Sequence, residues 1–372
     1  MPGMRWYHRS VLSRYFAYSV MHPTLKTSLH CAVDNSLRRV PLVLYSGTAG
    51  SLLVAGEERW SRYLPDRFFG SCLRESRHLG SYRTWQLPRV LRRWRDAANI
   101  TVARADRMTA RLFSAAEYLR VPEWIRMVAP VPASDDNILS RHAKRAMRTI
   151  RKNGLTWRIT RDPAELETYI ARDYEPYISR RYGADAYVRP RRWLRTRFRN
   201  GGLLWVEQTG VPIAGLLFEM RSGVFLHLTT ACVNADEHLL RLGAIDATYL
   251  FGFHAARSFG LATMDMLGCR PCLHDGLFRW KRKWGGAVAD KPDNIYDLLV
   301  RWTTATPAVM RFLAESPLIF RDGDGLSAIH TDRVTPRHKL LTPGLRRLVT
   351  LHPDAASGGW EEDQGDESAT DR

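Results

Sequence analysis

Three short apolar segments in close succession, at residues 202–208, 211–220 and 223–232, constrain the fold of this chain more than any other feature. Only the short polar turns Thr209-Gly210 and Arg221-Ser222-Gly223 join them. Connections this short join antiparallel neighbours, because a parallel pair needs a crossover of about a dozen residues or more. The sequence therefore predicts an antiparallel meander of three strands.

Helical and strand-like segments surround this meander in a regular order. A strand is expected at 155–160, a long helix at 162–183 and a second helix at 190–201. After the meander, the pattern predicts another long helix at 234–260 and a strand at 262–267. The expected order is strand, two helices, three strands, helix, strand, which indicates an α/β domain with a mixed, largely antiparallel sheet flanked by helices.

A smaller α/β domain is expected before this one. Short apolar runs alternate with amphipathic segments over 40–106, and Met108, Leu112 and Ala116 recur at helical spacing within 106–119. The stretch 129–136 is rich in Pro, Ser and Asp, which is typical of a boundary. The predicted division is an N-terminal α/β domain at 1–136, the main domain at 137–300, a C-terminal extension packed on the fold at 301–340, and a disordered tail, basic and then acidic, at 341–372.

The charge of the chain indicates an anionic partner. Lys and Arg number 56 against 38 Asp and Glu, which gives a formal net charge of +18 over 372 residues. Nucleic acid, a phosphorylated metabolite, an anionic lipid and an acidic polymer all fit such a surface. The alternative is an arginine-rich surface without a function.

The basic residues gather in two places. The helix expected after Ser140 presents cations at three- to four-residue spacing along one broad face, up to Asn153-Gly154. A second cluster, over 180–199, interleaves arginines with aromatic residues, a combination that suits phosphate and base contacts. A solvated surface is the alternative reading of either cluster alone.

Other classes of protein are not predicted. No stretch has the roughly 18 uninterrupted apolar residues of a membrane span, and no secretory signal is recognisable, so we expect a cytoplasmic protein. Five cysteines are no disulfide framework. Cys269 and Cys272, with His274, form only half of a zinc site, so no metal is expected.

Five stretches of the main domain carry a family resemblance. They read RTIRKNGL (148–155), DYEPYISRRYG (173–183), GGLLWVEQTGVPIAGLLFE (201–219), LLRLGAIDA (239–247) and LGCRPCLHDGLFRWKRKWGG (267–286). With them, residues 138–286 resemble the GNAT-fold acyltransferases related to the FemAB peptidyltransferases, including their BioF-like members. The resemblance implies a GNAT-like fold, with 1–136 as a possible degenerate partner half.

The resemblance also implies a reaction. An acyl group would pass from acetyl-CoA or another acyl-CoA to an amine or hydroxyl of an anionic or cell-envelope acceptor. In GNAT enzymes the donor pyrophosphate binds at a helix N-terminus, which here begins near Asn234. The run Arg241-Leu242-Gly243-Ala244 resembles the donor loop, but the two motif glycines fall on Ala244 and Asp246. Aminoacyl-tRNA therefore stays open as the donor, and a non-catalytic nucleic-acid-binding protein is the rival of another class.

Six residues are expected to work in the reaction, four of them on the basis of the resemblance. Lys281 matches the lysine that FemAB-like enzymes place near the reacting carbonyl. Asp275 is a candidate base, and Glu219 lies where some GNAT members carry a carboxylate base. On the acceptor side, the resemblance implies Tyr177 and Arg181, with Tyr182 beside them.

Overall fold

The computed structural model describes residues 39–56, 65–70, 73–106, 109–138, 140–183, 186–291, 294–331 and 336–352. They divide into two compact units. The meander unit contains Arg126–Gly268 and Trp280–Ala289, and the flanking unit contains the described parts of Ser19–Ile125, Cys269–Arg279 and Asp290–Arg372. This division differs from the expected one, because the flanking unit takes residues from both ends of the chain.

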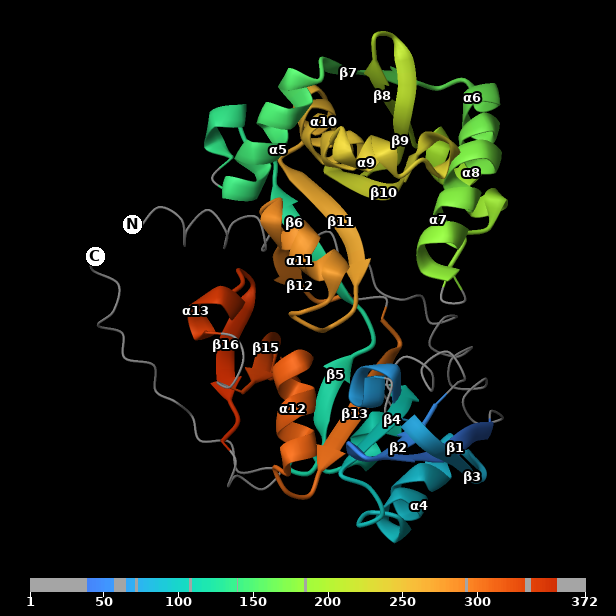
Figure 1. The fold of residues 1–372 in the computed structure, drawn as a ribbon, viewed down its shortest axis with the longest axis vertical. Helices are drawn as coiled ribbons and strands as arrows, with labels where there is room; N and C mark the ends of the chain where they lie inside the picture. Colours follow the sequence, from blue (N-terminus) through green and yellow to red (C-terminus); the bar gives the residue numbers. More distant parts are fainter. Residues whose placement is uncertain are drawn as a thin grey trace, which may run out of the picture. The chain divides into compact units, whose positions relative to one another are not determined.

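A seven-stranded sheet forms the centre of the meander unit, in the order β12-β6-β11-β10-β9-β8-β7 (Figure 1). The strands are β6 (Ile125–Pro130), β7 (Leu155–Thr160), β8 (Gly201–Gln208), β9 (Val211–Arg221), β10 (Val224–Cys232), β11 (Thr263–Cys269) and β12 (Ala287–Ala289). Strands β7 to β10 pair as antiparallel neighbours in chain order, whereas β10 and β11 run parallel. The predicted meander and the mixed, largely antiparallel GNAT-like sheet are confirmed.

Helices pack on both faces of this sheet. They are α5 (Arg141–Lys152), α6 (Pro163–Thr168), a π-helical turn η5 (Tyr169–Tyr174), α7 (Glu175–Tyr182), α8 (Arg191–Arg199) and α10 (Ala244–Ser258). On one face, Gly215 of β9 lies against the Tyr169 ring of η5, so that a Cβ would come within 2.7 Å of it. On the other face, Gly252 of α10 allows the helix to approach Leu216 and Met264. Helix α5 begins after Ser140 as predicted, and the Ser140 side chain caps it by accepting the Ala143 N–H.

The long helix expected over 234–260 is wrong in its first part. The chain forms a 3-10 turn η7 (Val233–Ala235) and a single turn α9 (His238–Arg241) before α10 begins. Gly243 separates α9 from α10 with φ 87°, a left-handed conformation that favours glycine. The N-terminus of the long helix therefore lies at Ala244, ten residues beyond the expected start at Asn234.

The flanking unit is built on a six-stranded sheet of order β3-β1-β2-β4-β13-β5. Its strands are β1 (Arg39–Gly47), β2 (Gly50–Ala55), β3 (Leu73–Arg83), β4 (Ile100–Asp106), β5 (Leu119–Pro122) and β13 (Tyr296–Trp302). Strand β13 pairs antiparallel with both β4 and β5. Residues near 300, expected in the main domain, thus complete the sheet of the other unit, and α4 (Leu87–Arg93) and α12 (Pro307–Glu315) belong to this unit as well.

Two further stretches differ from expectation. Among the described residues between β4 and β5, a 3-10 turn η3 (Thr109–Leu112) forms in place of the expected helix, and Met108 lies outside the described residues. The expected tail contains β16 (Leu345–Thr350), which pairs in parallel with β15 (Gly325–His330) beside β14 (Leu318–Asp322). A short helix α13 (Arg337–Leu340) precedes β16. Residues 353–372 lie outside the described residues.

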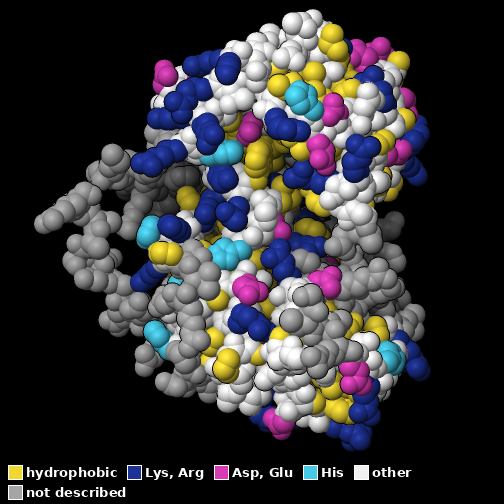
Figure 2. Space-filling model, in the orientation of Figure 1, with side chains coloured by type: hydrophobic (Ala, Val, Ile, Leu, Met, Phe, Trp, Pro, Cys, Tyr) yellow, Lys and Arg dark blue, Asp and Glu magenta, His cyan; other side chains and the backbone are white. Residues whose placement is uncertain are grey.

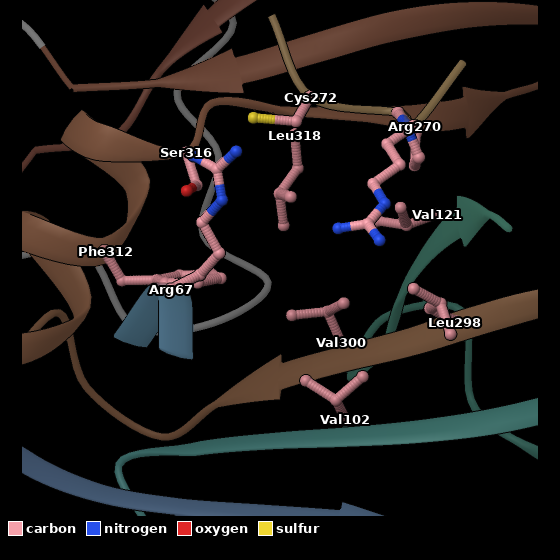
Figure 3. A pocket seen from close by; sticks show the side chains of 11 residues that line it. Arg67, Val102, Val121, Arg270, Cys272, Leu298, Val300, Phe312, Ser316 and Leu318 are labelled. Atoms are coloured by element: carbon pink, nitrogen blue, oxygen red, sulfur yellow. The ribbon is translucent and has the colours of Figure 1, made fainter. Parts of the chain in front are cut away.

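A small apolar cavity lies within the flanking unit (Figure 3). Its volume is about 30 Å³, and Val102, Leu298 and Phe312 are among its lining residues, with Cys272 at one side. That space holds a water molecule or two, since a water needs about 10–15 Å³ by this measure. Ligand pockets typically measure about 300–1,000 Å³, so this cavity is no candidate for a substrate site.

Candidate functional site

The parallel strands β10 and β11 pair over a short distance only. Val224, Phe225 and Leu226 pair with Thr263, Met264 and Asp265, although both strands continue for several residues. A register shift between His227 and Thr229 interrupts the pairing of β10 with β9 at the same level. The two neighbouring strands β10 and β11 therefore separate next to the register shift in β10. Backbone groups and side chains at this point can contact groups other than the neighbouring strand.

Strand β11 bends just after the paired residues. Leu267 has φ 62°, which is uncommon for a residue with a branched side chain. The carboxylate of Asp265 accepts the Leu267 N–H at 2.7 Å and a hydrogen bond from Arg126. Backbone strain of this kind costs about 1–3 kcal/mol and persists where the surroundings impose it. This bend is therefore held in place rather than relaxed.

Lys281 of α11 (Gly276–Lys283) fixes the same bend from the other side. Its Nζ donates to the carbonyls of Leu267 at 3.2 Å and Gly268 at 2.8 Å. The side chain is buried, at 3% exposure, whereas Arg279 and Lys283 of the same helix are exposed. The lysine that the family resemblance implies is therefore the buried cation of its helix, and it lies where β10 and β11 have separated.

His227 of β10 lies beside this position. Its ring is buried, stacks on Tyr249 of α10 at 4.3 Å between centroids, and leaves Nε2 without a hydrogen-bond partner among the described residues. Burial and the nearby Lys281 ammonium lower the pKa of His227 to about 3, so the ring is neutral. The sequence analysis missed this residue, and its only signal was a histidine inside an apolar strand.

Aromatic rings connect His227 to the start of α10. Tyr249 stacks on Trp284 at 5.8 Å, and Trp280 packs edge-on to His142 of α5 at 5.2 Å. His142 Nε2 lies 3.2 Å from the Asp246 carboxylate. Burial raises the pKa of Asp246. The N-terminus of α10, Lys281 and His227 therefore belong to one continuous cluster that is largely aromatic.

Glu219, a predicted base, lies on the opposite face of the sheet. It pairs with Leu226 of β10, whereas its neighbour Phe218 pairs with His227. Adjacent residues of a strand point to opposite faces, so Glu219 and His227 face different layers. The Glu219 carboxylate is 2% exposed and accepts from Arg197 at 2.8 and 3.0 Å. The ion pair with Arg197 explains why a carboxylate is buried at this position.

Asp275, the other predicted base, caps a helix. Its Oδ1 accepts the Phe278 N–H at 2.9 Å, and its carbonyl accepts from Arg279 at the same distance. Such a contact satisfies a donor at the start of α11. The role of Asp275 as a base remains a prediction.

The expected donor-binding residues lie along the loop between β10 and α10. The Asn234 N–H, expected to be free for a pyrophosphate, donates to buried Asp173 at 3.1 Å. Arg241 is exposed, and the Leu242 carbonyl accepts from the side chain of Asn153 at 2.9 Å. Gly243 and Ala244 form the actual start of α10. Of the expected set, the structure brings 241–244 together at the helix N-terminus and leaves Asn234 apart.

The expected acceptor-side residues form a second cluster on α7. Tyr177 accepts a hydrogen bond from Arg181 at 3.3 Å, and Tyr182 is exposed beside them. Burial raises the pKa of Tyr177 to about 12, and that of the Cys232 thiol at the end of β10 also to about 12. Both groups are neutral at physiological pH, and the Arg181 guanidinium beside them carries a positive charge.

The two predicted basic clusters differ in the structure. Exposed cations line α5, and Figure 2 shows Lys and Arg side chains gathered over it. One of them, Arg151, pairs with Asp135. Around α8, by contrast, three of the arginines pair with glutamates from α6, α7 and β9, whereas Arg192 and Arg199 are exposed. The pairs are Arg195 with Glu167, Arg191 with Glu175 and Arg197 with Glu219. Helix α5 contains no acid, so most of its positive charge is available to an anionic partner, whereas part of the charge around α8 is neutralised.

Within the described ranges, no three His, Cys, Asp or Glu side chains come together as a set able to hold a metal ion. Cys269 and Cys272 are buried, and neither forms a disulfide. None of the helices in these ranges combines the length and the apolar character needed to cross a membrane.

No protein-family model matches the chain, and no curated protein matches its sequence. Among solved structures, FemX is similar at 13% identity, over 78% of this chain and 95% of that one, with a TM-score of 0.38. L-PGS from Bacillus licheniformis is similar at 12% identity, over 74% of this chain and 84% of that one, with a TM-score of 0.35. A GCN5-related N-acetyltransferase from Sphaerobacter thermophilus is similar at 13% identity, over 68% of this chain and 72% of that one, with a TM-score of 0.32. The GNAT-like fold itself rests on the order and pairing of this chain's own strands.

Proposed function

We propose that this protein is a cytoplasmic acyltransferase that moves an acyl group from acyl-CoA to an amine or hydroxyl of an anionic or cell-envelope acceptor. The observation that carries the proposal is the buried ammonium of Lys281 at the point where β10 and β11 part. A GNAT-like strand order and the family resemblance of 267–286 support the same reading.

The reaction needs no covalent intermediate between the acyl group and the protein. The acceptor nitrogen or oxygen forms a bond to the thioester carbonyl carbon, the C–S bond breaks, and the CoA sulfur leaves with the electron pair and gains the acceptor's proton. Positioning the two substrates and stabilising the oxyanion of the tetrahedral intermediate are the main tasks. Lys281 would supply the positive charge, and its anchors Leu267 and Gly268 would hold it in place beforehand.

The donor would bind at the start of α10. Unpaired backbone N–H groups and the helix dipole favour an anion there, and exposed Arg241 adds charge one turn earlier. Gly243 would permit the left-handed backbone conformation from which this helix starts. Asn234 is left out of this donor site, since its N–H is held by Asp173.

Aminoacyl-tRNA is the alternative donor, favoured by the exposed cations of α5. The same surface would serve a nucleic-acid-binding protein without catalytic activity. In either case, binding should weaken steeply with salt, because released counterions drive it.

Acetyl-CoA is expected to raise the melting temperature of the full chain. Selective binding to the folded state adds about 2.7 kcal/mol when the ligand is at about one hundred times its Kd. Arg241→Glu should reduce the shift, whereas Arg221→Glu, an equally exposed arginine at the end of β9, should keep it. Differential scanning fluorimetry measures both. No shift with acetyl-CoA and a clear shift with aminoacyl-tRNA would replace the proposed donor, and no shift with either would contradict the proposal.

A further inference from the structure

The orphan nitrogen of His227 is the strongest feature that the proposed function does not use. Burial of a polar atom without a hydrogen bond costs about 1–3 kcal/mol, and most buried polar side-chain atoms in proteins have partners. His227 is 3% exposed, and its Nε2 has no partner among the described residues. Buried His330 of the flanking unit is the opposite case, since its two nitrogens contact the Thr331 carbonyl and Thr350 Oγ1 at 3.2 and 3.1 Å.

The ring of His227 is held rigidly. Tyr249 stacks on one face of it at an interplanar angle of 27°, and Gly252 of α10 lies so close that a Cβ would be 3.6 Å from the ring. A hydrogen bond with the residue's own backbone raises the pKa, which means that the ring donates in that bond. Nε2 therefore carries the lone pair and can accept a hydrogen bond.

The place of this nitrogen suggests its partner. His227 directly follows Leu226, the last residue of β10 that pairs with β11, and Lys281 is close enough to lower its pKa. A neutral ring beside the ammonium offers an acceptor next to a cation. An attacking amine or hydroxyl has a proton to donate and would fit the acceptor nitrogen of His227. The carbonyl oxygen that becomes negative during the reaction would fit the ammonium of Lys281.

We propose that His227 Nε2 accepts a hydrogen bond from the attacking amine or hydroxyl of the acceptor and so orients it toward the donor carbonyl beside Lys281. This inference rests on the proposed acyl transfer and adds a substrate-contacting residue to it. Because the ring remains neutral, it positions the nucleophile and does not store its proton.

His227→Phe separates this role from a structural one. Phe keeps a ring for the stack on Tyr249 and removes the unsatisfied atom, so the melting temperature should stay equal or rise. His330→Phe, the matched control, should lower it, because partners are left unsatisfied there. If the melting temperature of His227→Phe falls like that of the control, a buried water or other structural partner holds Nε2, and the proposal is overturned.

Transfer is then measured on the full chain with acetyl-CoA and hydroxylamine as a small surrogate acceptor. His227→Phe should lose about tenfold in turnover, the worth of about one hydrogen bond, and retain the thermal shift with acetyl-CoA. His227→Gln, whose amide oxygen can accept, should recover part of the loss. Wild-type turnover in His227→Phe would overturn the role of His227 alone. No transfer by the wild type would overturn the proposed function, and this role with it.

Discussion

Lys281→Met is expected to lower turnover about a hundred- to a thousand-fold, the usual effect of removing one preorganised oxyanion donor. Met keeps most of the side-chain volume and deletes the charge. The substitution also leaves the carbonyls of Leu267 and Gly268 without their donor, so the free energy of unfolding should fall by about 2 kcal/mol. Turnover is compared by steady-state kinetics, and stability by urea unfolding.

Lys283→Met is the matched control for this prediction. Lys283 belongs to the same helix and is exposed, so neither turnover nor stability should change appreciably. The assay temperature must lie well below the melting point of Lys281→Met, so that unfolding does not account for lost activity. Equal and small effects of the two substitutions on turnover would leave Lys281 as a structural anchor of β11.

Arg197→Leu is expected to lower the free energy of unfolding by about 3 kcal/mol, near the lower end for a broken buried ion pair, since Arg197 is itself partly exposed. The loss leaves the Glu219 carboxylate buried and without its main partner. Arg192→Leu, an exposed arginine of the same helix, should cost much less. Denaturant unfolding at neutral pH measures the difference between the two variants.

Glu219→Gln completes this test. If Glu219 is only a partner of Arg197, the variant should be mildly destabilised and retain turnover. A folded Glu219→Gln protein that loses turnover a hundred-fold would instead restore the base that the family resemblance implies.

The meander could be predicted because its information is local. Turns of a few residues between apolar segments allow only antiparallel pairing of the consecutive strands that they join. The division into units could not be predicted, because β13 pairs with β4 and β5, which lie about half the length of the chain before it. The break before α10 was missed for a different reason. A single glycine within a helical pattern is tolerated in many helices, and only its backbone angle in the structure shows that Gly243 ends one helix and begins another.

The distribution of surface charge was the property that the sequence predicted least well. The cluster over 180–199 has few acids in its own stretch, yet Glu167 of α6, Glu175 of α7 and Glu219 of β9 neutralise three of its arginines. Lys281 was identifiable from its surrounding pattern. His227 was not, because hydrogen-bond satisfaction is a property of the folded neighbourhood and leaves no trace in the sequence.

The central claim is tested most directly by following the acyl group. The full chain is incubated with acetyl-CoA labelled in the acetyl group and a cell-envelope extract, and label is measured in acceptors separated from the donor. Acyl transfer by way of Lys281 predicts labelled product with the wild type and with Lys283→Met, and a loss of about a hundred-fold or more with Lys281→Met. Label that stays entirely on CoA with the wild type, while nucleic acid binds in a salt-dependent way, would contradict the claim.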